Sequence, residues 1–349
     1  MIKSAIIVGQ GLAGTLLSWF LQKEKVKVYV VDQGLEESAS HIAAGIINPI
    51  TGRRVALSWN IDRLLPFARS TYRDLEDFLG DEFMQELPVD ALFDQPEVLE
   101  QWEVRREQEE YRDWVTEIGV SGPPHKSFRA ELGYARCAPA MQVNLPKLLL
   151  AWRKHLSTQH LLSEESFDYS KLMEDRNGWS YRSQHADVVF FAEGIGARHN
   201  PWFSELPVRP NRGQRLLIKA TGLNRDAVRR KGGLCCPMPE GHFWLGSTHE
   251  WHAEESGTTP EGLDILKEKA AGMLNTDWTV LDHSAGIRPT SKDRRPFVGK
   301  HPGYPGLAIL NGLGTKGTSL GPYYANILVR HLIYGEDIPD PVRLDRFIS

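Results

Sequence analysis

The segment Gly9-Gln10-Gly11-Leu12-Ala13-Gly14 decides how the first part of this chain folds. Residues 2–8, which precede it, are short, apolar and β-branched, and this pattern predicts a buried strand. Residues 12–23 carry apolar side chains at helical spacing, and residues 26–31 predict a second strand. The segment therefore predicts a turn between a strand and a helix, inside a unit whose two strands run parallel.

The spacing of the three glycines is typical of a turn that holds the diphosphate of a dinucleotide. Gly9 permits the tight turn, Gly11 lets phosphate approach the backbone, and Gly14 lets the helix pack closely on the strand. The free N–H groups of the helix start would face the phosphates. Asp32 ends the second strand, eighteen residues after Gly14. We expect its carboxylate to accept hydrogen bonds from ribose hydroxyls. The same carboxylate would repel a 2′-phosphate, which disfavours NADP.

Composition limits the class of protein. The 349 residues suggest about two domains, and 41% hydrophobic and 25% charged residues are ordinary for a globular chain. A net charge of −4 does not indicate a basic surface of the kind that binds nucleic acid or an anionic membrane. We see no signal peptide and no apolar run long enough for membrane insertion. The three cysteines show neither the spacing of a zinc site nor a disulfide framework. We therefore expect a cytoplasmic protein with no metal site, and monomer and homo-oligomer both stay open.

The rest of the chain alternates predicted helices and strands. Apolar periodicity predicts helices over 63–79, 144–156, 261–274 and about 320–333, and strands over 187–192, 214–221 and 242–249. Residues 97–118 are highly charged, with three aromatic residues interleaved, and we interpret them as an amphipathic helix with one solvated face rather than a nucleic-acid contact. Residues 34–60 lack periodicity, which in a compact domain usually marks a functional segment.

Three further blocks distinguish FAD from NAD. The first is the small-residue run from Ser38 to Ile47, and the second is Ala192-Glu193-Gly194-Ile195-Gly196 with the later segment Pro210-Asn211-Arg212-Gly213-Gln214. The third runs from Ala285 to Gly299, contains Gly286-Ile287-Arg288-Pro289, and is followed by the glycine-rich segment 311–322. With these blocks the chain resembles the FAD-dependent D-amino-acid oxidase/glycine oxidase (DAO) superfamily. The resemblance covers nearly the whole chain and is weak between about 80 and 185.

This resemblance implies an α/β fold, in which a Rossmann-like FAD-binding domain with a parallel sheet carries a second, mixed-sheet substrate domain. It implies a discontinuous FAD domain from 1–80, 140–212 and 286–349, and a substrate domain from 81–139 and 213–285. It also implies non-covalent FAD. The expected cofactor-binding residues are Gly9, Gly11, Leu12, Ala13, Gly14, Asp32, Gln33, Ser40, Ala43, Ala44, Gly45, Ile46, Gly194, Gly196, Gly312, Gly314, Thr315, Lys316, Gly317 and Thr318.

Three residues are the candidates for catalysis. In glycine-oxidase-like enzymes the arginine of the Gly-x-Arg-Pro motif binds the substrate carboxylate, and Arg288 stands at that position; the alternative is a structural salt bridge. Lys316 opens the last helix, where it would stabilise anionic reduced flavin or assist oxygen, or be an ordinary exposed lysine. His249 would act as a base, with His252 and His283 as further candidates, or belong to a surface cluster.

One position departs from the family pattern. Glycine-oxidase-like proteins often carry a tyrosine whose hydroxyl helps to hold the carboxylate, and Leu234 stands there. The expected function is oxidation of a small amine or amino acid by hydride transfer to flavin N5. The alternatives are a dehydrogenase for a 2-hydroxy acid or secondary amine, or an FAD-binding module without turnover.

Overall fold

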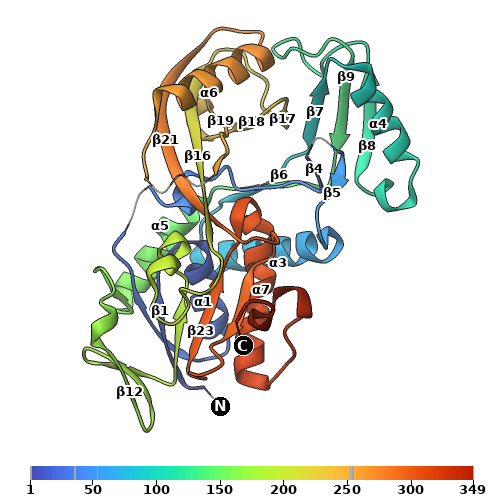
Figure 1. The fold of residues 1–349 in the computed structure, drawn as a ribbon. Coiled ribbons are helices and arrows are strands. Elements are labelled where there is room, and N and C mark those ends of the chain that lie inside the picture. The colour runs from blue at the N-terminus through green and yellow to red at the C-terminus, as the bar shows by residue number, and fades with distance from the viewer. Residues whose placement is uncertain (1, 35–36, 53, 252, 254, 349) are drawn as a thin grey trace.

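The computed structural model describes residues 2–34, 37–52, 54–251, 253 and 255–348. Two large sheets occupy opposite ends of the molecule, and the long strands of the upper sheet reach down toward the lower one (Figure 1). The seven helices of the described residues are α1 (Leu12–Lys23), α2 (Ala39–Ile42), α3 (Ile61–Leu79), α4 (Pro96–Arg106), α5 (Leu145–Thr158), α6 (Pro260–Met273) and α7 (Gly317–Tyr334).

The lower sheet contains the glycine-rich turn. Its strand order is β11 (Leu162–Ser163), β2 (Lys27–Val31), β1 (Ser4–Val8), β15 (Val188–Phe191), β23 (Leu307–Asn311) and β22 (Phe297–Lys300). All neighbours pair in parallel except β22, which runs antiparallel to β23. Strands β2 and then β11 add on one side of β1, and β15, β23 and β22 lie on the other, so β1 lies where the strand order reverses. Ligands of such sheets bind at this point, beyond the carboxyl ends of the strands.

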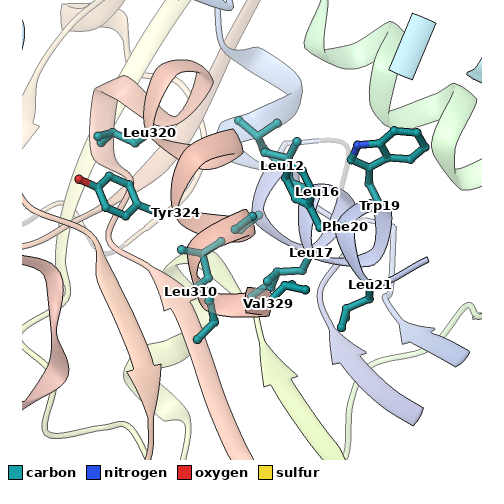
Figure 2. Packing of buried hydrophobic residues seen from close by; sticks show 14 of the residues in the cluster. Leu12, Leu16, Leu17, Trp19, Phe20, Leu21, Leu310, Leu320, Tyr324 and Val329 are labelled. Carbon is teal, nitrogen blue, oxygen red and sulfur yellow. The ribbon is translucent and has the colours of Figure 1, made fainter. Parts of the chain in front are cut away.

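A hydrophobic core fixes α1 against α7 on one face of this sheet. Figure 2 shows the apolar side chains of α1 meeting those of α7 and β23. Helix α1 is buried from Leu12 to Leu21, and most of these residues are apolar. A Cβ on Gly321 of α7 would come 2.8 Å from Leu16, so the two helices approach closely at this glycine. The starts of both helices therefore lie side by side.

The upper sheet has nine strands and is built from two distant parts of the sequence. Its order is β20 (Glu250–Trp251), β16 (Arg209–Ala220), β19 (His242–Gly246), β18 (Leu234–Pro237), β17 (Val228–Arg230), β7 (Val89–Phe93), β9 (Gly133–Cys137) and β8 (Val115–Val120), with β21 (Trp278–Thr290) also paired to β16. Helix α6 covers one face of it, where Leu266, Ala270 and Met273 pack on Leu216 and Ile218.

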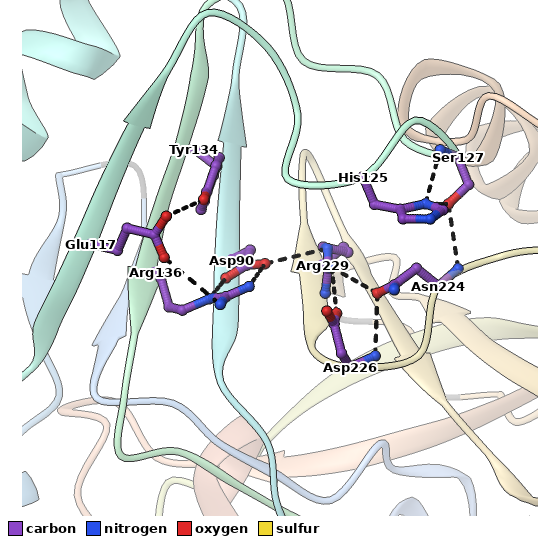
Figure 3. A network of polar contacts seen from close by, with 9 residues as sticks. All are labelled: Asp90, Glu117, His125, Ser127, Tyr134, Arg136, Asn224, Asp226 and Arg229. Carbon is purple, nitrogen blue, oxygen red and sulfur yellow. Dashed lines mark hydrogen bonds and ion pairs between the residues drawn. The ribbon is translucent and has the colours of Figure 1, made fainter.

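A buried ionic network joins these two parts (Figure 3). Asp90 of β7 is fully buried and accepts two hydrogen bonds from Arg136 of β9, at 2.8 and 2.9 Å. The Nε atom of Arg229, in β17, lies 3.4 Å from the same carboxylate, and Arg229 also pairs with Asp226 at 2.6 Å. The division of the chain at the domain boundaries expected above remains a prediction.

Short strands complete the molecule. They are β3 (Ile46–Ile47), β10 (Met141–Val143) and β6 (Met84–Glu86) in one sheet, β12 (Leu172–Asp175), β13 (Gly178–Tyr181) and β14 (Gln184–Ala186) in another, and the hairpin of β4 (Ile50–Thr51) and β5 (Ala56–Leu57). The segment 34–60 is thus less irregular than its sequence suggested.

The prediction of one helix over 97–118 was wrong for the part after Arg106, which is more than half of the segment. Helix α4 ends at Arg106, a short 3₁₀ turn covers Glu109–Tyr111, and β8 begins at Val115. Strand β8 pairs with β9, and that tertiary pairing overrides the helical interpretation of a charged segment. No helix among the described residues is long and apolar enough to cross a membrane.

Candidate active site

The glycine-rich turn has the close backbone approaches that its sequence predicted. Gly9 has φ +98°, and a Cβ on it would lie 2.6 Å from the carbonyl oxygen of Ala192 in the strand end beside it. A Cβ on Gly14 would lie 1.8 Å from the carbonyl oxygen of Gly9. Both positions therefore exclude any side chain, for the reason that the motif requires.

The start of α1 is open to an anion. Its N-cap, Gly11, has no side chain to cap the helix, and the first turn holds no acidic residue. The hydroxyl of Ser40 accepts a hydrogen bond from the N–H of Leu12 at 3.1 Å, which brings the predicted segment around Ser40 to this turn. The first N–H groups of a helix, here including that of Ala13, have no partner within the helix and are available to a diphosphate. The backbone N–H donors at the start of α1, the small residues around them and their position at the reversal of the strand order all fit an FAD-binding site.

Asp32 lies at the end of β2, beside the turn. Its carboxylate accepts hydrogen bonds from the N–H of Gln10 and of Gly34, both at 2.7 Å. It also forms an ion pair with Arg153 of α5 at 2.8 Å. Arg153 was not foreseen, because it is more than a hundred residues away and only folding brings α5 to this edge. Gln33, the next residue, is exposed.

The run from Ala43 to Ile46 passes next to the same edge. Gly45 has φ +68°, and a Cβ on it would lie 1.8 Å from the carbonyl oxygen of Val143 in β10. Ala44 and Gly45 are buried, while Ala43 and Ile46 are partly exposed. Gly45 therefore cannot carry a side chain, because β10 packs directly against it.

The second and third blocks meet at the carboxyl ends of β15 and β23. The side-chain amide of Asn311 donates to the carbonyl oxygen of Gly194 at 2.8 Å and its oxygen accepts from the N–H of Gly312 at 2.7 Å. Gly194 and Gly312 have φ +57° and +70°. Gly196 lies in the 3₁₀ turn η3 (Gly194–His199). Asn311 therefore joins two turns that are far apart in sequence.

The segment before α7 completes this edge. Gly314, with φ +56°, begins the 3₁₀ turn η5 (Gly314–Lys316), and α7 follows from Gly317. A Cβ on Gly317 would lie 3.5 Å from Leu12, so the start of α7 is next to the diphosphate turn. Thr315 is exposed, and Thr318 is buried.

Lys316 is not an ordinary exposed lysine. Its ammonium group donates to the hydroxyls of Ser58 at 2.9 Å and Thr51 at 3.2 Å. Burial, together with the nearby charges of Arg295 and Arg294, lowers the pKa of Lys316 to about 8. Because its hydrogen-bond partners are neutral hydroxyls and its pKa is lowered, the Lys316 ammonium group is a cation that has lost much of its hydration.

Arg288 lies on the face of the upper sheet opposite to α6. Its guanidinium group crosses over Gly213, where a Cβ would come 1.8 Å from Nη2. It donates to Asn211 Oδ1 and Ser247 Oγ, both at 2.7 Å. Burial lowers the pKa of Arg288 to about 10, which leaves the group charged near neutral pH. Among the described residues no carboxylate forms an ion pair with it, so the alternative of a structural salt bridge finds no support there.

The acid whose charge acts on Arg288, Glu250, is bound by other groups. Glu250 pairs with Arg212 at 2.6 Å and accepts hydrogen bonds from Gln214 and Thr248 at 2.6 and 2.7 Å. Arg288 is therefore a desolvated cation with unfilled capacity for an anion.

The candidate histidines do not lie together in one site. Burial, and then the charges of Arg288 and Lys269, lower the pKa of His249 to about 4, so its imidazole is neutral near pH 7. His283 pairs with Leu216, whose side chain packs under α6, so by strand alternation it faces away from Arg288. His252 lies outside the described residues. Among those residues no group of three potential ligands could hold a metal ion.

Several residues of this site carried no signal of their own in the sequence. Asn211 and Ser247 were within quoted segments but had no assigned role, and Lys269, which donates to the carbonyl oxygen of Ser247 at 2.7 Å, comes from α6. Strand alternation along 209–220 could have placed Asn211 and Gly213 on one face, because Leu216 and Ile218 mark the other.

The fold and the carboxyl ends of the lower sheet's strands define a flavoprotein-type dinucleotide site, and the upper sheet carries the buried Arg288. A family profile described as FAD dependent oxidoreductase, DAO, matches residues 4–331. The chain belongs to this family, and it is therefore an FAD-dependent oxidoreductase enzyme.

The relatives match nearly the whole of this chain. Glycine oxidase of Pseudomonas putida is 26% identical, with 98% of this chain and 97% of that protein covered. The tRNA 5-methylaminomethyl-2-thiouridine biosynthesis bifunctional protein MnmC of Caulobacter vibrioides is 24% identical over 96% of this chain and 55% of that protein. Iminodiacetate oxidase from Chelativorans sp. BNC1 has the same fold, with a TM-score of 0.80, 19% identity, and 99% and 98% of the two chains covered.

Proposed function

We propose that this enzyme oxidises a small amine or amino acid that carries a carboxylate, with Arg288 binding that carboxylate. The observation that carries the proposal is the buried Arg288 guanidinium, fixed by Asn211 and Ser247 and without an acidic partner among the described residues. A planar guanidinium group binds a carboxylate through two parallel hydrogen bonds. The glycine oxidases among the relatives support the same class of substrate.

The cofactor residues of the proposal are the predicted ones: Gly9, Gly11, Leu12, Ala13, Gly14, Asp32, Gln33, Ser40, Ala43, Ala44, Gly45, Ile46, Gly194, Gly196, Gly312, Gly314, Thr315, Lys316, Gly317 and Thr318. Bound FAD supplies the hydride acceptor, at flavin N5. The chain contributes positioning, because Arg288 orients the substrate and leaves the flavin to carry the redox chemistry. His249 is neutral near pH 7 and could accept a proton.

A secondary amine is the second candidate substrate. Leu234 offers no hydroxyl to a carboxylate, and it presents an apolar surface on the face that carries Arg288. An N-substituent could pack on this surface. The names of MnmC and of iminodiacetate oxidase point in the same direction, because both refer to compounds with a substituted amine nitrogen.

The test is anaerobic mixing of the FAD-loaded enzyme with glycine, N-methylglycine, iminodiacetate and lactate. Bleaching of the flavin by an amine identifies the substrate class. In Arg288→Gln we expect the concentration for half-maximal bleaching to rise by roughly 100-fold, because a charged hydrogen-bonded pair is lost. Arg209→Gln, an exposed arginine on β16, should behave as wild type. Unchanged bleaching in Arg288→Gln, or bleaching by lactate alone, would contradict the proposal.

A further inference from the structure

A second desolvated cation lies on the sheet face that carries Arg288, and the proposed reaction does not use it. This residue is Arg230 of β17. Its Nη1 donates to the carbonyl oxygen of Gly52 at 3.2 Å, and its guanidinium group lies 5.9 Å from the ring centre of Trp102. Among the described residues no carboxylate forms an ion pair with it. The next residue, Arg229, points to the other face and pairs with Asp90 and Asp226.

The strand register places Arg230 in line with the carboxylate site. Arg230 pairs with Leu234 of β18, and Leu234 pairs with Gly246 of β19. Paired residues of antiparallel strands share a face, so these three positions form a row across the sheet. Ser247, to which Arg288 is bound, follows Gly246 directly. Two strand spacings, about 10 Å, separate Gly246 from Arg230.

The charges on this face do not balance within the described protein. Burial lowers the pKa of Arg230, and only the Cys137 thiol acts in the opposite direction. A carbonyl oxygen and an aromatic ring compensate only part of the cost of removing a guanidinium group from water. The proposed function assigns an anionic partner to Arg288, and the resemblance assigns one to Lys316. Arg230 has none.

We propose that Arg230 recognises a second anionic group on the substrate, which makes the substrate an amine with two acidic groups. The group bound by Arg288 is the carboxylate next to the amine. The other group lies at the far end, reached across the apolar surface of Leu234. This inference rests on the proposed function, because it needs Arg288 as the first anchor.

The experiment titrates oxidised, FAD-loaded enzyme with acids that lack an amine and follows the flavin absorption spectrum. Pentanedioate, hexanedioate and heptanedioate are compared with pentanoate, hexanoate and heptanoate. We expect the best dicarboxylate to bind about tenfold tighter than the monocarboxylate of equal length, since one charged pair is gained. In Arg230→Gln this advantage should vanish while monocarboxylate affinity stays unchanged. The matched control is Arg225→Gln, because Arg225 is exposed and donates to the carbonyl oxygens of His242 and Met238.

The outcomes separate the two proposals. Equal affinity for dicarboxylates and monocarboxylates in wild-type enzyme overturns the role of Arg230, whether or not the variant folds. A dicarboxylate advantage that survives in Arg230→Gln, with a wild-type melting temperature, also overturns it. If neither series binds through Arg288, so that Arg288→Gln changes no affinity, the proposed function fails instead.

Discussion

Lys316 combines a buried ammonium group with two hydroxyl partners at the start of α7. With a pKa of about 8, it is neutral in much of the oxidised enzyme above that pH. An anionic reduced flavin next to it would restore the proton. In that position the residue would couple proton uptake to reduction, which a permanently charged arginine could not do.

We therefore expect the midpoint potential of bound FAD to fall more steeply with pH above pH 8 than below it. The extra slope should be about 30 mV per pH unit, as for one proton on a two-electron couple. Lys316→Met should remove this extra slope and lower the potential at pH 7. Spectroelectrochemical titration between pH 6.5 and 9.5 measures both effects, and identical slopes in the two proteins would exclude the coupling.

Glu193 is a second residue with an altered proton affinity. It follows β15, where its carboxylate binds the hydroxyl of Tyr169 and the amide of Asn200. Burial raises the pKa of Glu193 to about 7, although both hydrogen bonds act in the opposite direction. A carboxyl group whose folded pKa exceeds its unfolded value of about 4.5 favours the folded state at low pH, and this contribution is lost as pH rises through 7.

The prediction is that Glu193→Gln makes the melting temperature less dependent on pH. Wild type should lose stability relative to the variant between pH 5 and pH 8, because the folded state must then hold a buried charge. Glutamine retains an acceptor for Tyr169, so the variant should fold. Calorimetry at several pH values gives the comparison, and parallel melting curves for the two proteins would show that the group is not perturbed.

At the scale of elements, the junction of β1 and α1 depends on the absence of side chains. The space at Gly14 is filled by the carbonyl oxygen of Gly9, at 1.8 Å from the position of a Cβ. A methyl group there must displace backbone and change the shape of the turn. Gly272 in α6 provides the contrast, because a Cβ on it meets no atom within 4 Å.

We expect Gly14→Ala to lower the free energy of unfolding by about 1–3 kcal/mol and to weaken FAD binding, since the clash lies in the diphosphate turn. Gly272→Ala should instead be neutral or stabilising by up to about 1 kcal/mol, because alanine favours the helix. Chemical denaturation and flavin fluorescence titration measure the two quantities. Equal behaviour of the two variants would contradict the close packing of this turn.

On the scale of the whole molecule, the upper sheet depends on charges that its two sequence segments share. Asp90 and Arg229 are both fully buried, and Arg136 completes the contact between β7, β9 and β17 (Figure 3). Removal of one charge from such a network leaves the others desolvated without compensation. The position of β17, and with it Arg230, depends on this network.

Asp90→Asn should therefore cost about 3–5 kcal/mol of stability, as is usual when one partner of a buried pair is removed. Asp94→Asn, which breaks the partly exposed pair with Lys231, should cost only about 0–1 kcal/mol. Urea denaturation of FAD-loaded protein compares them. A loss below about 1 kcal/mol in Asp90→Asn would show that the network contributes little.

The sequence by itself determined the strand–turn–helix–strand unit, the dinucleotide class of the site and most helices, because these depend on local periodicity and on glycine spacing. It also identified Arg288 and Lys316 through their motifs. Only the tertiary structure decided that Asp32 is paired with Arg153, that β8 is a strand rather than the end of a helix, and that Arg288 and Arg230 share a face. These features depend on the pairing of distant segments, and the energy of such pairing belongs to no single stretch of sequence.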